Sequence, residues 1–196
     1  MMLSSYEPPA LEIRLTLGLG LTVLSPYYRG FANSLHLRGD ERVLDFGSGS
    51  GICSRHIAAR LQHGGLLDCV DISRGWMNVL RKTLRRFTNV GYHLGHITQL
   101  DLPEAGFDVV VIHFVLHDIP TEERLAVVQS LAGRLKPTGQ IVLREPQGEG
   151  LEIEELNRLA ALAGLKPAEF TAHKIAIGAV YDARYIKEGV LENVYK

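Results

Sequence analysis

A glycine-rich segment that follows an apolar run constrains the fold of this chain more than any other feature. The segment runs from Asp45 to Gly51 with the letters DFGSGSG, after Val43-Leu44 and before the helix-like run Ile52–Ile57. Glycine has no Cβ, so the backbone can turn tightly there, bring its N–H groups close to a ligand and let a helix pack against the strand. The segment therefore predicts a strand, a tight turn and a helix whose N-terminus faces a bound ligand.

The spacing of the glycines distinguishes between classes of ligand. A dinucleotide fingerprint requires G-x-G-x-x-G, and Ile52 stands where its last glycine would be. Asp45 suits a cationic ligand, because a fixed negative charge would repel phosphate. Roughly 20 residues after the loop, the run from Leu66 ends in Asp71, the distance at which a βαβ unit brings a carboxylate to ribose hydroxyls. The two acids favour a cationic ligand that carries a ribose.

Strand-like and helix-like patterns alternate from Gly39 onward, which is typical of an α/β protein with a doubly wound sheet. We expect seven mostly parallel strands with helices on both faces. The last strand is predicted to be antiparallel, because the connection near Gly178 is too short for a parallel crossover. The predicted strands are Arg42–Phe46, Leu66–Asp71, Val90–Leu94, Phe107–His113, Gln140–Arg144, Ala168–Ile175 and Ala179–Ile186.

Composition and charge narrow the classes of function. The formal net charge is -1, whereas most nucleic-acid-binding proteins are basic, so we expect no nucleic-acid partner. Cys53 and Cys69 show no metal-ligand spacing, which favours a reducing compartment and no metal site. No run reaches the roughly 20 apolar residues of a membrane span, and Met1–Pro9 lacks the basic start of a signal peptide. These features predict a cytoplasmic protein with no transmembrane segment.

Three motifs carry a resemblance to a known family. The glycine-rich segment resembles the first motif of the class I S-adenosylmethionine-dependent methyltransferases. Asp71 and the following Ile72–Trp76 resemble the segment that leads from that family's second acid into a helix. The run Lys136–Leu143 is similar to the family's L-K-P-G-G before the fifth strand, with Thr138 in place of a glycine. The resemblance covers Gly39 to Lys187.

The resemblance implies S-adenosyl-L-methionine as cofactor. In the family, the glycine loop holds the amino-acid end of the cofactor, so Asp45 would accept from its ammonium group and Asp71 from the ribose hydroxyls. Ile72 would lie against the adenine ring. Trp76 either forms a wall of the adenine pocket or belongs to the core face of a predicted helix from Arg74 to Phe87. The predicted cofactor-binding residues are Asp45, Gly47, Ser48, Gly49, Gly51, Asp71, Ile72, Trp76, His96, Ile97, His113 and Tyr28.

Histidines follow two of the predicted strands. Relatives often have an acid at the position of His96; a histidine can accept a hydrogen bond only as the neutral tautomer, whereas the backbone of His96 and Ile97 can still contact the adenine edge. His113 and His117 follow the fourth strand, where the transferable methyl group would point, and histidine has a suitable pKa for a general base. We expect both to be catalytic; the alternative is that they are structural features of the loop.

The N-terminal region is predicted to be a helical arm or lid over residues 1–38, next to a Rossmann-like methyltransferase domain over residues 39–196, the two forming a single domain overall. The stretch Leu15–Leu24 is apolar and too short to span a bilayer. It offers an apolar wall to a hydrophobic acceptor, while Tyr28 and Arg29 can reach the cofactor carboxylate. The alternative is a helix that simply packs on the sheet.

The resemblance implies an enzyme that moves a methyl group to a small, hydrophobic acceptor by in-line displacement. Two other classes stay open: a catalytically silent subunit that binds the cofactor and a partner protein, and, with less support from the glycine spacing, an NAD(P)-dependent oxidoreductase. The sequence does not identify the acceptor or the methylated atom. A homodimer is left open as well.

Overall fold

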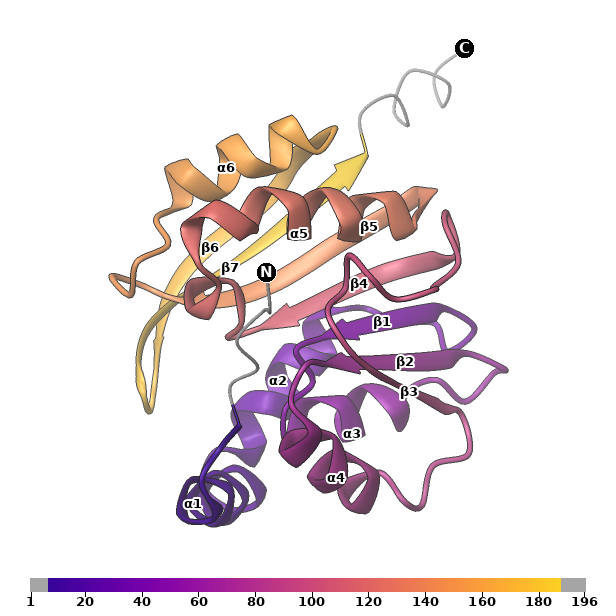
Figure 1. Ribbon diagram of the computed structural model, residues 1–196, viewed down its shortest axis with the longest axis vertical. Coiled ribbons are helices and arrows are strands. Elements are labelled where there is room, and N and C mark those ends of the chain that lie inside the picture. The colour runs from indigo at the N-terminus through magenta and orange to yellow at the C-terminus, as the bar shows by residue number, and fades with distance from the viewer. Residues whose placement is uncertain (1–6, 188–196) are drawn as a thin grey trace. The chain divides into compact units, whose positions relative to one another are not determined.

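The computed structural model describes residues 7–187, and the chain divides into two compact units, Met1–Leu100 and Asp101–Lys196. We call them unit 1 and unit 2 (Figure 1). Unit 1 contains α1 (Ala10–Leu21), α2 (Ser25–Ser34), β1 (Arg42–Phe46), α3 (Ile52–Ala58), β2 (Leu66–Asp71), α4 (Arg74–Thr83) and β3 (Val90–Leu94). Unit 2 contains β4 (Phe107–His113), the 3₁₀ helix η1 (Leu116–Asp118), α5 (Thr121–Arg134), β5 (Leu135–Pro146), α6 (Ile153–Leu162), β6 (Leu165–Ile175) and β7 (Gly178–Lys187).

Unit 1 is built on three parallel strands in the order β3-β2-β1. Val43 and Leu44 in β1 and Leu67 and Val70 in β2 are fully buried, as expected for parallel strands that helices cover. Both α3 and α4 pack against β2, and α2 packs against α3. Because β1 and β2 are parallel, their carboxyl ends lie at the same edge, where the glycine-rich loop begins.

Unit 2 is built on four strands in the order β4-β5-β7-β6. The β4 and β5 strands are parallel, whereas β7 runs antiparallel to both β5 and β6. The hairpin between β6 and β7 turns at Gly178, whose φ of +146° suits glycine. The α5 and α6 helices pack against each other and lie along the same side of these strands (Figure 1).

The full strand order is β3-β2-β1-β4-β5-β7-β6, with helices flanking the sheet. It confirms the predicted fold class, a seven-stranded, mostly parallel sheet with an antiparallel last strand. The predicted bounds of β1, β2, β3 and β4 agree with the structure. Of residues 7–187, no helix combines the length and the apolar character that crossing a membrane requires.

The fifth strand begins earlier than predicted. It starts at Leu135 rather than Gln140, directly after α5. Leu135 pairs with Phe107 beyond an irregularity in the β4–β5 register, so tertiary pairing extends the strand through a Lys-Pro-Thr-Gly run that by itself indicates a turn. Gly139 permits this approach, because a Cβ there would lie 2.9 Å from the carbonyl oxygen of Phe107.

Other element bounds also differ from the prediction: β5 ends at Pro146 rather than Arg144, and β7 spans Gly178–Lys187 rather than Ala179–Ile186. The β6 strand begins at Leu165 rather than Ala168, because Leu165 pairs with Lys187 at the end of β7. The α4 helix ends at Thr83, short of the predicted Phe87. The Thr83 hydroxyl donates to the carbonyl oxygen four residues earlier (3.1 Å), a contact that competes with helical hydrogen bonding.

Candidate functional site

The glycine-rich loop of unit 1 has a backbone that favours glycine at three positions. Gly47, Gly49 and Gly51 have φ values of +70°, +50° and +78°. At Gly51, which is the N-cap of α3, a Cβ would also lie 2.6 Å from Leu80 Cδ1. The N–H groups of Gly47 and Ser48 donate to the carbonyl oxygen of Val70 (2.9 and 3.0 Å), which fixes the loop against β2. The sequence pattern therefore reflects both a left-handed backbone and close packing.

Asp71, at the end of β2, holds the loop in place. Its Oδ2 accepts from the N–H of Gly49 (2.8 Å) and its Oδ1 from the N–H of Ser73 (2.8 Å). Burial raises the pKa of Asp71, and the hydrogen bonds from the backbone at Ser73 and Gly49 oppose that shift. A carboxylate has about four acceptor positions, so Asp71 retains capacity for ribose hydroxyls. The contact with Gly49 gives Asp71 a positioning role that sequence reasoning missed.

Asp45, at the end of β1, is almost completely buried. Its Oδ2 accepts a hydrogen bond of 2.5 Å from the hydroxyl of Ser54 on α3, a partner that the sequence analysis did not identify. Burial raises the pKa of Asp45 to about 6; hydrogen bonds from Ser54 and Ser48 oppose the shift, and the charge of Asp71 adds to it. A cation bound beside Asp45 would favour its ionised form.

The other predicted cofactor residues of unit 1 differ in burial. Trp76 is half-buried, whereas its neighbour Met77 takes the core position on α4, and Ile72 is exposed. Ile97 is fully buried. His96 Nδ1 lies 2.7 Å from the hydroxyl of Thr98, which orients the ring.

Tyr28 lies on α2 and is half-buried. Burial raises the pKa of its hydroxyl, and the nearby thiol of Cys53 adds to the shift. Since Cys53 belongs to the first turn of α3, Tyr28 lies near the helix that follows the glycine-rich loop. This is where the sequence analysis expected the N-terminal region to approach the cofactor.

Glu7 contributes to the site without any local sequence signal. Its Oε1 accepts from the N–H of Arg74 (2.9 Å), and its Oε2 accepts from the N–H of Gly75 (2.9 Å) and the hydroxyl of Ser73 (3.0 Å). These hydrogen bonds lower the pKa of the carboxyl group. A carboxylate is favourable at a helix N-terminus, and here it belongs to the chain segment just before α1. Glu7 is separated from these partners by more than 60 residues, so periodicity could not reveal the contact.

In unit 2, a buried carboxylate organises the segment after β4. Glu145 is fully buried at the end of β5. Its Oε1 accepts from the N–H groups of Val115 (3.0 Å) and Leu116 (2.9 Å), and its Oε2 lies 2.6 Å from His117 Nδ1. This arrangement assigns the Nδ1 proton of His117 to the hydrogen bond with Glu145 and leaves Nε2 to accept a proton.

Acidic neighbours set the protonation of His117. Its Nε2 lies 3.5 Å from Asp118 Oδ1 and 3.9 Å from Glu149 Oε2. Burial pulls the pKa of His117 down, but the hydrogen bond and charge of Glu145, together with the charges of Asp118 and Glu149, outweigh it, so the pKa lies above its ordinary value. A histidine oriented by a carboxylate can serve as a general base.

His113 has a different environment. Its ring meets the ring of Phe114 edge-on, with centroids 4.5 Å apart. Burial and then the charge of Arg144 lower the pKa of His113 to about 3. His113 is therefore neutral at physiological pH and a weak base. Of the two predicted catalytic histidines, His117 is the one with a carboxylate partner at Nδ1 and a raised pKa.

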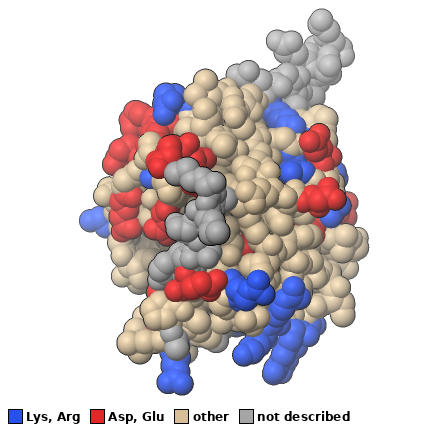
Figure 2. Space-filling view, viewed as in Figure 1, with Lys and Arg blue, Asp and Glu red and all other residues tan. Residues whose placement is uncertain are grey.

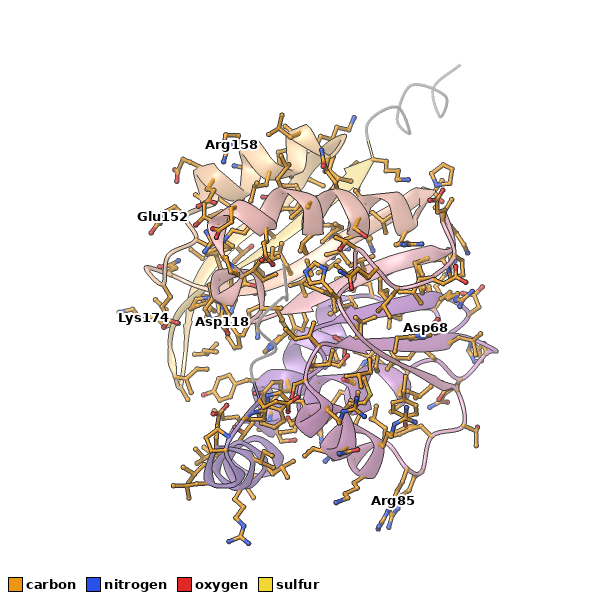
Figure 3. The ribbon with its side chains drawn as sticks, in the orientation of Figure 1. Asp68, Arg85, Asp118, Glu152, Arg158 and Lys174 are labelled. Carbon is orange, nitrogen blue, oxygen red and sulfur yellow. The ribbon has the colours of Figure 1, made fainter. Side chains whose placement is uncertain are left out.

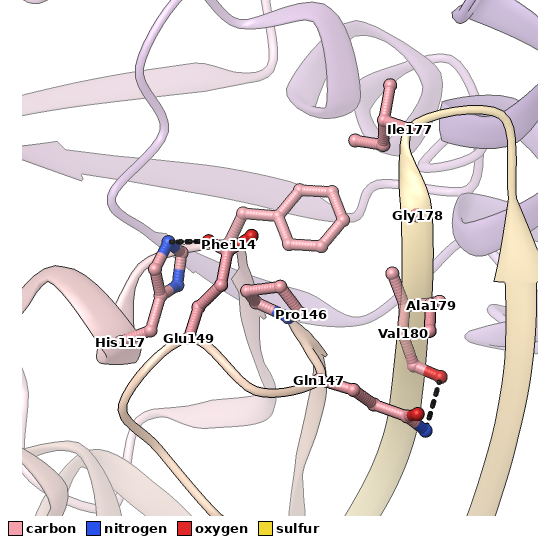
Figure 4. Close-up of a pocket in the computed structure, with 9 residues that line it drawn as sticks. All are labelled: Phe114, His117, Pro146, Gln147, Glu149, Ile177, Gly178, Ala179 and Val180. Atoms are coloured by element: carbon pink, nitrogen blue, oxygen red, sulfur yellow. Dashed lines mark hydrogen bonds and ion pairs between the residues drawn. The ribbon is translucent and has the colours of Figure 1, made fainter.

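A cavity of about 250 Å³ lies next to His117 (Figure 4). His117 and Glu149 form one side of it and the start of β7 forms the other. Phe114, in the cavity wall, has a φ of +58°, a strained value for an aromatic residue, and its N–H donates to the carbonyl oxygen of Arg144 (2.9 Å). The lining residues are Phe114, His117, Pro146, Gln147, Glu149, Ile177, Gly178, Ala179 and Val180.

Comparison with known proteins identifies relatives of this chain. The profile of a family described as a methyltransferase domain matches residues 43–139. A ubiquinone/menaquinone biosynthesis C-methyltransferase, UbiE, from Coxiella burnetii (strain Dugway 5J108-111) is 29% identical over 123 residues, which are 61% of this chain and 48% of that protein. An uncharacterized methyltransferase from Mycobacterium bovis is 31% identical over 119 residues, 60% of this chain and 56% of its own length. The chain spans about half the length of these curated relatives.

Solved structures share the fold. A SAM-dependent methyltransferase from Aquifex aeolicus superposes with a TM-score of 0.69 at 16% identity, covering 91% of this chain and 98% of that one. The [4+2]-cyclase SpnF superposes with the same TM-score and identity, covering 83% of this chain and 81% of its own. At this level of identity the likeness concerns the fold alone.

Proposed function

Since the chain belongs to the class I S-adenosylmethionine-dependent methyltransferases, enzymes whose cofactor is S-adenosyl-L-methionine, we propose that it transfers a methyl group to a small, hydrophobic acceptor. The observation that carries the proposal is the pair of acids in unit 1: a buried Asp45 and an Asp71 bound to the backbone of the glycine loop. The acceptor, the in-line geometry and the residue roles below belong to this proposal.

The residues of unit 1 fit the cofactor. Space is open around Gly49, where a Cβ would meet nothing closer than the carbonyl oxygen of Gly47 at 3.9 Å. Burial of an ionised Asp45 costs free energy, and a cationic ligand beside the carboxylate would offset that cost. We assign the ammonium group to Asp45, the ribose hydroxyls to Asp71 and the adenine to the exposed side chain of Ile72.

The cofactor, when bound, supplies a methyl group on a positively charged sulfur. Direct displacement requires alignment, exclusion of water and, for a protonated acceptor, removal of one proton. Nε2 of His117 takes that proton, while the hydrogen bond from Nδ1 to Glu145 holds the ring and stabilises its charged form.

The acceptor is proposed to be apolar and acidic at the methylated atom. The cavity beside His117 combines Phe114, Pro146 and Ile177 with one basic nitrogen. A small aromatic or quinone-like ring with a weakly acidic hydrogen has this chemistry. The printed name of the Coxiella burnetii relative, a C-methyltransferase of ubiquinone/menaquinone biosynthesis, suggests carbon as the first atom to test.

The state of the cysteines favours a reducing location. Cys53 and Cys69 are both buried and form no disulfide, and burial raises the pKa of the Cys69 thiol, which makes it unreactive. We propose the cytoplasm as the compartment in which the enzyme works.

Isothermal titration with S-adenosylmethionine and with NAD(P)H tests the cofactor, and an assay with methyl-labelled cofactor and a panel of phenols and quinols tests the transfer. Binding of S-adenosylmethionine without transfer to any acceptor in a cell extract would support the silent subunit instead. Preference for a nicotinamide cofactor would overturn the assignment of the site.

Asp71→Asn is expected to weaken S-adenosylmethionine binding by about 10- to 150-fold, or about 1.5–3 kcal/mol, the range for hydrogen bonds to a charged group. The amide cannot accept at both atoms, so the ribose and the N–H groups of Gly49 and Ser73 lose a partner. Asp68→Asn is the matched control, because Asp68 is on the same strand and binds Arg42 and His93 instead. Equal affinity in the two folded variants would refute the role of Asp71.

Without cofactor, the contribution of Asp45 to the free energy of unfolding is expected to fall as pH rises from about 4 to about 6. The pKa of Asp45 is raised to about 6 in the folded state, so between these pH values the folded protein binds more protons than the unfolded chain. Asp45→Asn removes this dependence. Urea unfolding should show the variant gaining about 2–3 kcal/mol relative to the wild type between pH 4 and pH 7. A constant difference across this range would show that Asp45 is not buried as an acid.

A further inference from the structure

Unit 1 exposes a row of large apolar side chains along one side of α1 and its end. Leu11, Leu15, Leu19 and Val23 follow one another at intervals of four residues, and each is more than half exposed. We call these four residues the leucine row. Four-residue spacing places Leu11, Leu15 and Leu19 on one face of α1, and Val23 follows just past the end of the helix. Gly20 faces the protein, because a Cβ there would run into Ile52. Soluble proteins rarely expose such a row unless something covers it.

Unit 1 also carries a concentration of cations. Figure 2 shows Lys and Arg side chains gathered over α4, and Figure 3 shows Arg85 extending outward just beyond the end of that helix. A hollow of about 380 Å³ is present there, and the part of the chain that the structure describes places no carboxylate in its wall. We call it the basic hollow; it is lined by Arg55, Lys82, Thr83, Arg85, Arg86 and Phe87.

The two units differ in charge. Residues 1–100 contain eleven Lys and Arg but seven Asp and Glu, whereas residues 101–196 contain ten Lys and Arg and fifteen Asp and Glu. Unit 1 is therefore positive by four charges and unit 2 negative by five. Several acids of unit 1 already accept hydrogen bonds, such as Glu7 at the start of α4 and Asp68 from Arg42. The formal charge of -1 for the whole chain conceals a basic unit 1.

We propose that unit 1 docks on an anionic lipid bilayer, with the leucine row among the acyl chains at the interface and the basic hollow on lipid phosphates. The α1 helix has 12 residues, about 18 Å, and lies in the plane of the interface rather than across it. Apolar insertion and attraction of cations to anionic headgroups each give modest binding, and together they hold a protein on a membrane.

Charge argues for lipid over a second copy of the chain. A symmetric dimer that buried the leucine row would bring the same unit of both copies together, and each is positive. An anionic surface instead complements these cations. On the exposed side of α1 in the described residues, the charged side chain is Arg14, also a cation. Docking stands apart from methyl transfer, although it would give the enzyme access to lipid-soluble acceptors.

The test is co-sedimentation of the full chain with phosphatidylcholine vesicles, prepared with and without phosphatidylglycerol. We expect binding to the mixed vesicles, weakened by salt. The double variant Leu15→Ser with Leu19→Ser should lower partitioning onto the mixed vesicles at least tenfold. The double variant Arg85→Ser with Arg86→Ser should lower partitioning roughly fivefold for each charge removed, and only on the mixed vesicles. Leu162→Ser and Arg158→Ser, exposed positions on α6, are the matched controls and should change nothing.

Three outcomes would overturn the proposal. The first two are no binding of the protein to either kind of vesicle and equal binding to both kinds. The third is a dimer in size-exclusion chromatography that does not bind vesicles and that Leu15→Ser with Leu19→Ser converts to monomer. Titration of the same proteins with S-adenosylmethionine in the absence of vesicles separates the two proposals. If a variant loses vesicle binding but still binds the cofactor, the result bears only on the membrane-docking proposal. If the wild type does not bind the cofactor, the result contradicts only the proposed function.

Discussion

Replacing Gly49 by valine is expected to abolish S-adenosylmethionine binding in a protein that still folds. Gly49 has a φ of +50°, which a β-branched residue resists at a cost of about 1–2 kcal/mol. The protein itself leaves room for the new side chain, since the nearest atom to a Cβ is 3.9 Å away. The valine would instead occupy the space through which the loop backbone approaches the cofactor. Isothermal titration measures the effect.

Gly64→Val is the matched control for this prediction. Gly64 is also in unit 1, has a φ of +89° and has nothing within 4 Å of its Cβ position. The Gly64→Val variant should lose a similar amount of stability and keep its affinity for the cofactor. Near-native affinity in Gly49→Val would mean that this glycine serves only the turn.

His117→Ala is expected to lower turnover by about 100- to 10,000-fold with little change in cofactor affinity, the usual effect of losing a general base. In the wild type, turnover should rise with pH through a midpoint above 6.5, because His117 must be neutral to accept a proton and its pKa is raised. Glu145→Gln should move that midpoint down, since it removes the negative charge beside Nδ1.

His63→Ala, an exposed histidine in unit 1, is the control and should retain full turnover. If His117→Ala lowers turnover by less than about threefold, His117 is not a general base, and catalysis rests on alignment of the acceptor alone. If folded Glu145→Gln protein shows the same dependence of turnover on pH as the wild type, the buried carboxylate of Glu145 has no part in proton transfer.

The sequence predicts those parts of the fold that local patterns specify. The bounds of β1 and β2 could be read because each is a short, mainly apolar run that ends in an acid or at a glycine turn. The beginning of β5 could not, because Lys-Pro-Thr-Gly indicates a turn until Leu135 pairs with Phe107. Tertiary pairing overrides local preference at that point.

The candidate site was predictable to the same degree. Asp45, Asp71 and the glycines are identified by spacing within one βαβ unit. The contacts of Ser54 with Asp45, of Glu7 with Gly75 and of Glu145 with His117 could not be predicted, because they form only in the folded chain. The structure also distinguishes two histidines that looked equivalent: burial and then the charge of Arg144 lower the pKa of His113, whereas Glu145 raises the pKa of His117 against the effect of burial.

The carboxylate of Glu7 joins two parts of unit 1 that the chain separates widely. Glu7 and Asp71 both hold Ser73, one through its hydroxyl and the other through its N–H. Ser73, the N-cap of α4, therefore donates to a carboxylate from the N-terminal region and to a second one at the end of β2, the acid that we propose for the ribose. The segment just before α1 is thus tied to the same residue as the proposed nucleoside site, although it lies far away along the chain.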